Sequence, residues 1–261
     1  MPPTQHEKGA EFRALHDGEP FVIPNPWDAG SAKVLAGMGF RALASTSSGF
    51  AFTLGRRDGR ATLDEVAAHV ESLVRATDLP VSVDLENGYA EGPAVAITRI
   101  AEAGAVGGSI EDWDPAVGLY ELPKAIERVE AAVEAAHGLG WPFTLTARAE
   151  NHIRGNPDLD DTIARLQAFE QAGADVLYAP GLANADEIRA VCSAVSKPVN
   201  VLARPTLTMA EIAEAGGRRV SVGGALTWTA ISAFVEAATA IRERGDFSSL
   251  GDSSDFQTWL S

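Results

Sequence analysis

Short runs of apolar and β-branched residues alternate with longer segments of helical spacing along almost the whole chain. A short apolar run that ends in polar residues or glycine is typical of a buried strand, whereas apolar residues three and four positions apart indicate an amphipathic helix. Eight strands are predicted, at residues 21–26, 42–46, 81–86, 107–112, 143–150, 176–181, 198–203 and 219–224. Eight helices are predicted between or after them, at residues 29–39, 62–78, 93–104, 124–140, 159–173, 184–195, 208–216 and 227–244.

Helix boundary signals support this division. Three helices begin at a capping residue that is followed three positions later by Glu: Thr62 with Glu65, Asn184 with Glu187, and Thr208 with Glu211. Four helices end at a glycine that can adopt the left-handed C-cap: Gly39, Gly104, Gly173 and Gly216. Each of these glycines comes shortly before a strand, so one βα unit is repeated.

Eight repeated βα units predict a (β/α)₈ TIM barrel, in which parallel strands close into a cylinder surrounded by helices. An open doubly wound sheet is the alternative, although eight units exceed its usual size. No GxGxxG opens the first helix, and no GxxxxGK[ST] occurs in the chain. Motifs that hold nucleotide phosphates are therefore missing.

Composition narrows the class of protein. With 261 residues, 46% of them apolar, we expect a single domain over residues 1–261, with a short N-terminal extension and a C-terminal tail. A net charge of −15 disfavours nucleic acid as a partner. The lone Cys192 excludes a disulfide framework, and no segment has the pattern of a signal peptide or a membrane span. We therefore expect a cytoplasmic protein with no membrane partner.

Polar side chains gather where the predicted strands end. In a barrel all these carboxyl ends meet at one mouth, which is where enzymes of this fold build their active sites. The candidates are Trp27 after the first strand, Thr46, Ser47 and Ser48 after the second, Asp84 and Glu86 at the third, Glu111 and Asp112 at the fourth, Arg148 and Glu150 at the fifth, and Asn200 on the seventh.

The acidic members of this set predict a metal site. Asp84 and Glu86 lie two positions apart and can both point inward. Crowded carboxylates would raise one another's pKa values unless a cation neutralised them, and an oxygen-only set favours Mg²⁺, or Mn²⁺, over zinc. For any one of these acids, a solvated loop carboxylate or a helix cap is the alternative. Trp27 is a candidate for stacking on a substrate, although a tryptophan at a barrel mouth can equally pack against its neighbours.

Several motifs, in this order and spacing, resemble those of the isocitrate lyase and phosphoenolpyruvate mutase superfamily. They are PNPWDAGSAKVLAGMGFRALASTSSG, LGRRDG, VDLENGY, GGSIED, ARAEN and AGADVLYAPG, and the similarity runs from about Phe21 to Gly224. The resemblance implies a Mg²⁺ ion held, mostly through water, by Asp84, Glu86 and Glu111, with Asp58 of GRRDG near its shell. It also implies a homotetramer that exchanges the last helix, about 227–244.

The resemblance further implies how a small carboxylate substrate is held. Thr46, Ser47, Ser48 and Arg148 correspond to the groups that contact the carboxylate and the 2-oxo group, and Asn200 corresponds to a polar contact from strand 7. Two positions depart from the pattern. Glu86 stands where Asp is usual, and the loop after strand 4 reads WDPAVGLYELP. That loop lacks the cysteine of the isocitrate and methylisocitrate lyases, and also the lysine and the threonine or asparagine of the phosphonopyruvate enzymes.

The missing cysteine bears on the reaction. Family chemistry proceeds through an enolate, and a metal bound to the 2-oxo group stabilises it. Decarboxylation needs no acid for its leaving group, whereas retro-aldol or retro-Claisen cleavage needs a base and usually a proton donor. Candidate catalytic residues are Arg148 and Asp58, with Tyr120, Glu121 and Asp114 of the loop and His152 after strand 5 as candidate proton donors. For His152, a histidine outside the reaction centre is the alternative.

These observations lead to one hypothesis and two alternatives. The hypothesis is a Mg²⁺-dependent carbon–carbon lyase, with decarboxylation favoured, acting on a small 2-oxo or 2-hydroxy di- or tricarboxylic acid. The first alternative is a phosphonopyruvate-type P–C hydrolase or mutase. The second is a catalytically silent barrel that binds an oxo acid.

Overall fold

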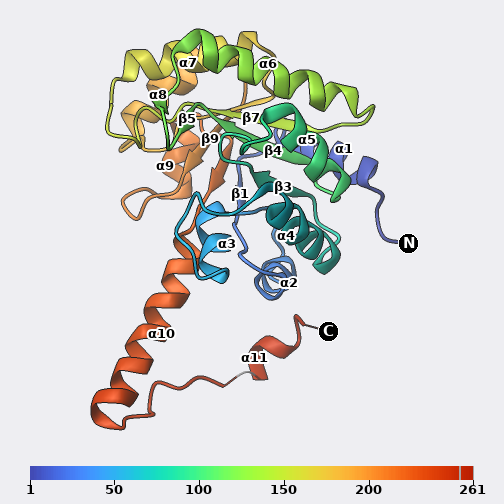
Figure 1. Ribbon diagram of the computed structural model, residues 1–261. Coiled ribbons are helices and arrows are strands. Elements are labelled where there is room, and N and C mark those ends of the chain that lie inside the picture. Colours follow the sequence, from blue (N-terminus) through green and yellow to red (C-terminus); the bar gives the residue numbers. More distant parts are fainter. Residues whose placement is uncertain (253, 261) are drawn as a thin grey trace.

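The computed structural model describes residues 1–252 and 254–260 and contains an eight-stranded parallel sheet (Figure 1). Its strand order is β1-β10-β9-β8-β7-β4-β3-β2. The strands are β1 Phe21–Ile23, β2 Leu43–Ala44, β3 Val81–Asp84, β4 Gly107–Glu111, β7 Thr144–Arg148, β8 Val176–Tyr178, β9 Val199–Leu202 and β10 Arg219–Ser221. The Ala44 amide donates to the carbonyl of Pro24 at 3.0 Å, which joins β2 to the end of β1. The predicted (β/α)₈ barrel is confirmed.

All eight predicted helices are present around this sheet. They are α2 Ala29–Gly37, α4 Leu63–Ala76, α5 Pro93–Glu102, α6 Leu122–Gly138, α7 Leu159–Gln171, α8 Ala185–Ala194, α9 Met209–Glu214 and α10 Ala225–Arg244. The capping predictions are confirmed, because the side chains of Thr62, Asn184 and Thr208 each accept a hydrogen bond from the amide three residues later. The four predicted C-cap glycines all have positive φ.

Four further elements were not predicted from the sequence. They are α1 Gln5–Leu15, α3 Ser47–Thr53, a hairpin of β5 Trp113–Asp114 and β6 Gly118–Leu119, and α11 Ser254–Gln257. Helix α1 begins at Thr4, whose side chain forms a capping box with Glu7. Its Phe12 is fully buried and lies so close to Gly107 that a Cβ on that glycine would be 2.7 Å from the ring. Helix α1 therefore packs on the amino-terminal end of β4.

Alternation along the strands separates an apolar layer from a polar interior. In β3, Val81 and Val83 are buried in the apolar clusters between strands and helices. Ser82 and Asp84 line a cavity on the barrel axis, which Val83 also borders. Bulky branched side chains usually fill the interior of such barrels, so this interior departs from the common pattern.

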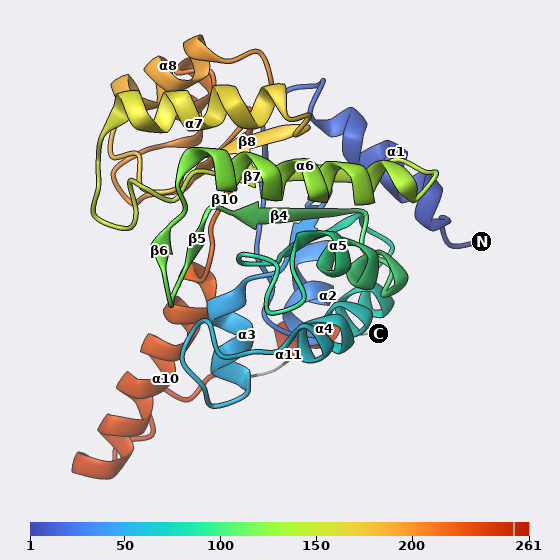
Figure 2. The ribbon, with the colours of Figure 1, turned by 45° about the horizontal axis from the view of Figure 1, so that its top comes forward.

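The C-terminal part leaves the barrel. Helix α10 projects away from it, and the chain then returns toward α2 (Figures 1 and 2). Trp259 lies against Gly37 of α2, where a Cβ would be only 2.2 Å from the indole, and Lys33 Nζ donates to the carbonyl of Leu260 at 2.8 Å. Among the described residues, none of the helices combines the length and hydrophobicity required for a bilayer span.

Candidate active site

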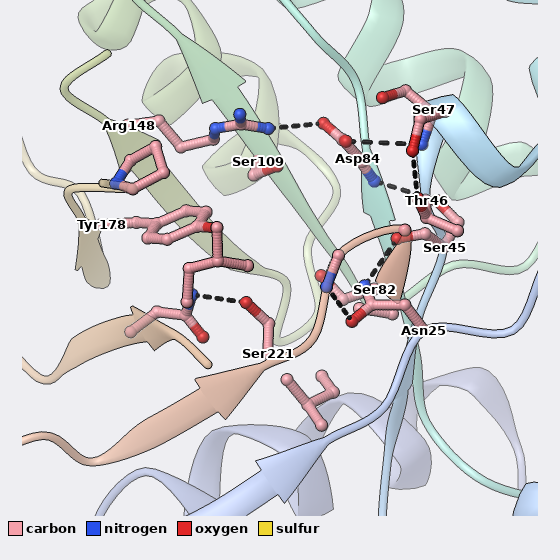
Figure 3. A pocket seen from close by; sticks show the side chains of 18 of the residues that line it. Asn25, Ser45, Thr46, Ser47, Ser82, Asp84, Ser109, Arg148, Tyr178 and Ser221 are labelled. Carbon is pink, nitrogen blue, oxygen red and sulfur yellow. Dashed lines mark hydrogen bonds and ion pairs between the residues drawn. The ribbon is translucent and has the colours of Figure 1, made fainter. Parts of the chain in front are cut away.

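Two adjoining cavities lie at the carboxyl ends of the strands. The first has a volume of about 200 Å³ and extends along the barrel axis (Figure 3). The second, of about 420 Å³, opens under the β5–β6 hairpin. Ser47, Asp58 and Arg148 line both. The structure thus places a hydroxyl, a carboxylate and a guanidinium where the two cavities meet.

Arg148, the last residue of β7, is the centre of the charge network. Its guanidinium pairs with Asp84 at 2.8 Å, with Glu150 at 2.7 Å and with Glu111 at 3.1 Å. These side chains converge because β3, β4 and β7 are neighbours in the sheet, with Glu111 and Arg148 in register. In Figure 3, Arg148 and Asp84 face one another across the pocket. The predicted convergence of Asp84, Glu111 and Arg148 is therefore observed.

Arg154, in the turn after β7, is a second cation at this site. Its Nη2 lies 3.0 Å from Glu150 and 3.4 Å from Glu111, and its guanidinium stacks 3.7 Å from the centre of the Trp113 ring. Trp113 belongs to the hairpin, so this contact ties the hairpin to the acidic cluster. Arg154 was not predicted from the sequence, because its turn has no periodic pattern.

Asp112, also predicted at the mouth, points elsewhere. Its carboxylate pairs with Arg165 of α7 at 3.0 Å and accepts the Glu150 amide at 2.8 Å, and it is nearly inaccessible to solvent. Asp112 therefore lines neither cavity and instead fixes the backbone position of Glu150 through this hydrogen bond.

Glu86 has an unusual backbone and environment. Its φ of 50° is in the left-handed region, which a non-glycine residue enters only at a cost in free energy. Burial, together with the negative charges of Asp84 and Asp58, raises its pKa to about 8. Glu86 lines the second cavity, where Arg148 and Arg154 oppose this rise of the pKa only in part.

Glu111 is more deeply buried and has a different partner set. Only 5% of its side chain is exposed, and it lies between Arg148 and Arg154. Burial raises its pKa well above the usual range even though Arg148 opposes the shift. Both carboxylates thus retain protons at higher pH than ordinary glutamates.

The charges around the two cavities fit a divalent cation. Five carboxylates, Asp58, Asp84, Glu86, Glu111 and Glu150, gather around or directly behind the cavities, facing three arginines, Arg60, Arg148 and Arg154. When all are ionised, two negative charges remain unbalanced. Oxygen ligands of this kind suit Mg²⁺ or Mn²⁺. Within residues 1–252 and 254–260, no three acidic, histidine or cysteine side chains converge as a direct ligand set. The residues fit an ion that keeps part of its water shell.

The predicted substrate-binding hydroxyls lie at the start of α3. The Thr46 side chain caps this helix by accepting the Gly49 amide at 3.4 Å, and it lies 3.3 Å from Ser48 Oγ. The Ser47 amide donates to Asp84 at 3.4 Å. All three hydroxyl residues line the first cavity. The residues that follow strand 2 thus form a short helix, α3, that begins at the cavity.

Of the other predicted site residues, some line the cavities and others do not. Asn200 lines the first cavity, but its side chain is already bonded to Ser221 and Arg219. Trp27 packs beside Gly49, and neither described cavity at the mouth includes it. Asp58 lines both cavities while remaining exposed to solvent; partial desolvation and the charge of Asp84 raise its pKa, although a hydrogen bond with Ser47 limits the rise.

Tyr120 and His152 are not brought to the cavities. The Tyr120 hydroxyl donates to Asp114 at 3.1 Å, and the Arg128 guanidinium lies over its ring. His152 Nδ1 is 2.8 Å from the Thr162 hydroxyl at the start of α7. Their catalytic roles stay predictions that would need the hairpin or the turn to move.

Several residues that line the first cavity were not singled out from the sequence. They are Ser45, Ser82, Ser109, Tyr178, Ser221 and Arg219. The available signal was a small polar residue at an inward position of nearly every strand, where a barrel usually has Val, Ile or Leu.

Comparisons with known proteins identify the family of this chain. The family model described as phosphoenolpyruvate phosphomutase matches residues 12–242. An oxaloacetate decarboxylase from Bradyrhizobium sp. is 31% identical over 246 residues, covering 88% of this chain and 84% of that protein. A 2-methylisocitrate lyase from Halalkalibacterium halodurans is 32% identical over 216 residues, covering 76% and 68%.

A solved structure shares the fold. A candidate lyase/mutase from Burkholderia cenocepacia superposes with a TM-score of 0.94 at 49% identity, covering 98% of this chain and 96% of that chain. Because the family model spans most of the barrel, the similarity includes every strand that contributes to the two cavities. The chain belongs to the isocitrate lyase and phosphoenolpyruvate mutase superfamily.

Proposed function

We propose that this protein is a Mg²⁺-dependent carbon–carbon lyase that decarboxylates a small 2-oxo di- or tricarboxylic acid through an enolate. The observation that carries the proposal is the junction of the two cavities, where Arg148 meets a surplus of carboxylates. The guanidinium supplies the contact for a substrate carboxylate, and the carboxylates supply oxygen ligands. The names of the oxaloacetate decarboxylase and methylisocitrate lyase relatives support this class of chemistry.

The ion, when bound, would act as a Lewis acid that stabilises negative charge on the 2-oxo oxygen. Asp84, Glu86 and Glu111 are proposed to hold it, mostly through water. Ser47, Thr46 and Ser48 present hydroxyl and amide groups at the start of α3, where they can orient the carboxylate and the oxo group. Asn200 is proposed to act through its contact with Ser221 in the cavity wall.

The hairpin over the second cavity favours decarboxylation. Residues 113–119 offer no thiol and no ammonium group, so the usual proton donors of the family's cleaving enzymes are missing. Departing CO₂ requires no proton, and only carbon 3 must then be protonated. Asp58 is proposed as the donor, since it lines both cavities and its raised pKa keeps it protonated to a higher pH.

The test is pyruvate or homologous 2-oxo acid release from a panel of oxaloacetate-type acids, with Mg²⁺ and with EDTA. We expect turnover that EDTA abolishes, and Asp58→Asn to reduce turnover while calorimetric binding of oxalate, an enolate mimic, is retained. If no acid in the panel turns over with Mg²⁺ present, the activity is wrong. Oxalate binding without any turnover would instead support a silent oxo-acid-binding barrel.

Phosphonate chemistry is the second candidate, because the matching family model is that of phosphoenolpyruvate phosphomutase. Phosphate release from phosphonopyruvate distinguishes it directly. The hairpin sequence disfavours it, since the lysine and the threonine or asparagine of those enzymes are missing.

We also propose a homotetramer in which α10 is exchanged between subunits. Trp228, Phe234 and Val235 of this projecting helix are 45–67% exposed, and exposed apolar surface of this extent is typical of an interface. Light scattering of the intact protein measures the mass, and a monomer at micromolar concentration would contradict the assignment.

A further inference from the structure

The first cavity continues along the barrel axis from Arg148 toward the amino-terminal ends of the strands, and this deeper part is here called the shaft. Its wall includes Ile23, Val83 and Leu202, together with small polar side chains from β3, β4, β9 and β10 and from the residues just after β1 and β2. The polar side chains are Asn25, Ser45, Ser82, Ser109, Asn200 and Ser221. Figure 3 shows Asn25, Ser45, Ser82 and Ser221 around the pocket on the side away from the Arg148–Asp84 pair. Small hydroxyl side chains leave space on the axis that Val, Ile or Leu would fill.

Arg219, the first residue of β10, lies at the lower end of this shaft. It lines the cavity, yet only 5% of it is exposed. Its Nε donates to Asn200 at 2.8 Å and its Nη2 donates to Thr146 at 2.9 Å. Its Nη1 is 3.2 Å from His16 Nε2 of α1. Three of the five N–H groups of the guanidinium are thus used, and two are left for another acceptor.

The partners of Arg219 are all neutral. His16 Nδ1 lies 2.8 Å from the Phe12 carbonyl, which can only accept, so Nδ1 carries the proton and Nε2 accepts from Arg219. Burial and the neighbouring guanidinium hold the pKa of His16 down, at about 3, so it stays uncharged. Among the described residues, no carboxylate forms an ion pair with Arg219, whereas Arg148 and the buried Arg165 of α7 each pair with acids.

A buried charge without a counterion is costly, so an anion entering the shaft would be bound strongly. Arg148, Tyr178, Asn200 and Arg219 are successive register partners on β7, β8, β9 and β10. At about 4.8 Å per strand, the two arginines are roughly 14 Å apart along the wall. Both side chains reach into the same cavity, so a single small molecule can contact them both.

We propose, building on the proposed function, that Arg219 binds a carboxylate in a tail of the substrate. The substrate is therefore a 2-oxo acid that carries this anionic tail on carbon 3. This tail is distinct from the carboxylate that departs. An arginine paired with the departing group would stabilise the ground state and oppose its loss. In the reaction, the bond between carbons 3 and 4 breaks, its electron pair forms the enolate, CO₂ leaves and carbon 3 takes a proton. The product keeps the tail carboxylate and is a 2-oxo dicarboxylic acid.

The test compares matched 2-oxo acids by calorimetry in the presence of Mg²⁺. The pairs are 2-oxoglutarate with 2-oxopentanoate and 2-oxoadipate with 2-oxohexanoate, which differ by the tail carboxylate. In the unmodified protein we expect at least one dicarboxylate to bind on the order of 100-fold tighter than its partner. Arg219→Met should reduce this ratio to about 1 while oxalate, which has no tail, keeps its affinity within about 3-fold.

Two further variants separate ligand binding from a purely structural role. Arg219→Lys keeps the charge and should retain most of the preference. Thr146→Val removes one hydrogen bond to Arg219 without changing charge, and should leave the ratio intact. If Arg219→Met does not fold, Arg219→Gln, which removes the charge but keeps a polar side chain, replaces it and should likewise reduce the ratio to about 1.

The inference is overturned if the unmodified protein does not distinguish the members of either pair, or if the preference survives in Arg219→Met. Equal weakening of oxalate and dicarboxylates would also overturn it, because that result indicates a structural role. Failure of the proposed function has a different signature, namely the absence of any turnover with Mg²⁺. The binding ratio can be measured whether or not turnover occurs.

Discussion

Replacing Glu86 with Gln tests the electrostatic account of the site directly. The change removes one negative charge, keeps the shape of the side chain and leaves the left-handed backbone as it is. Glu86 has a pKa of about 8 in the folded protein, raised by burial and then by Asp84 and Asp58, against an ordinary value of 4.5. Ionised Glu86 therefore destabilises the metal-free fold.

The direction and size of the effect follow from proton linkage. Below pH 4.5 the carboxyl is protonated in both the folded and unfolded states, so its ionisation does not reduce the free energy of unfolding there. As pH rises from 4.5 through 8, the unfolded state releases its proton first, and the free energy of unfolding falls. At about 1.4 kcal/mol per pH unit, reduced for partial solvent screening, the loss amounts to about 2–4 kcal/mol. We expect Glu86→Gln to be more stable than the unmodified protein by this amount at pH 9 in EDTA, and nearly equal to it at pH 4.5.

The assay is urea unfolding at pH 4.5, 7 and 9, in EDTA and in excess Mg²⁺. Glu91→Gln, which makes the same charge change at an exposed site in the following loop, is the matched control and should shift stability by less than about 0.5 kcal/mol. Mg²⁺ should restore stability to the unmodified protein at pH 9 and do so less in the variant. A Glu86→Gln protein that is less stable at pH 9 in EDTA, or that matches the control, would refute the reasoning.

Three other predictions concern the arginines around the site. Arg165→Met leaves Asp112 buried without its 3.0 Å partner, so calorimetry should give a Tm lower by about 6–20 °C, whereas Arg189→Met at an exposed pair should change it little. Arg148→Met should lower kcat/KM at least about 100-fold and raise Mg²⁺ affinity in calorimetry, because three carboxylates lose their cation. Trp113→Ala removes the stacking on Arg154, so amide exchange of the hairpin should accelerate about 2- to 30-fold, and unchanged exchange would contradict the contact.

The sequence was sufficient for the barrel and for the acidic rim. Parallel strands share one carboxyl-terminal edge, so placing Asp84, Glu111 and Arg148 at strand ends was enough to predict that they meet. The capping residues likewise acted locally, over three positions. These predictions needed only strand order and short-range hydrogen bonds.

Other parts of the site depend on contacts that the hydrophobic periodicity of the sequence does not predict. His16 and Arg219 are 203 positions apart, and their contact requires α1, whose few apolar residues gave no helical signal. Tyr120 was a sound candidate by position, but the hairpin turns its hydroxyl toward Asp114. Arg154 reaches the cluster only because its turn folds back over Glu150. In each case, the side-chain direction is set by an element that the periodicity did not predict.

The geometry also couples the two ligands of the proposed reaction. Arg148 is the main counterion of Asp84 and Glu150 in the metal-free protein. A substrate carboxylate that binds Arg148 adds negative charge to a site that already has a surplus, so its binding is unfavourable unless a cation arrives as well. A cation alone meets carboxylates that Arg148 already engages. Each ligand therefore lowers the cost of binding the other, and by linkage the gain in affinity must be reciprocal. A divalent cation balances the two surplus negative charges of the ionised site, so the oxo acid binds more tightly once the cation is present.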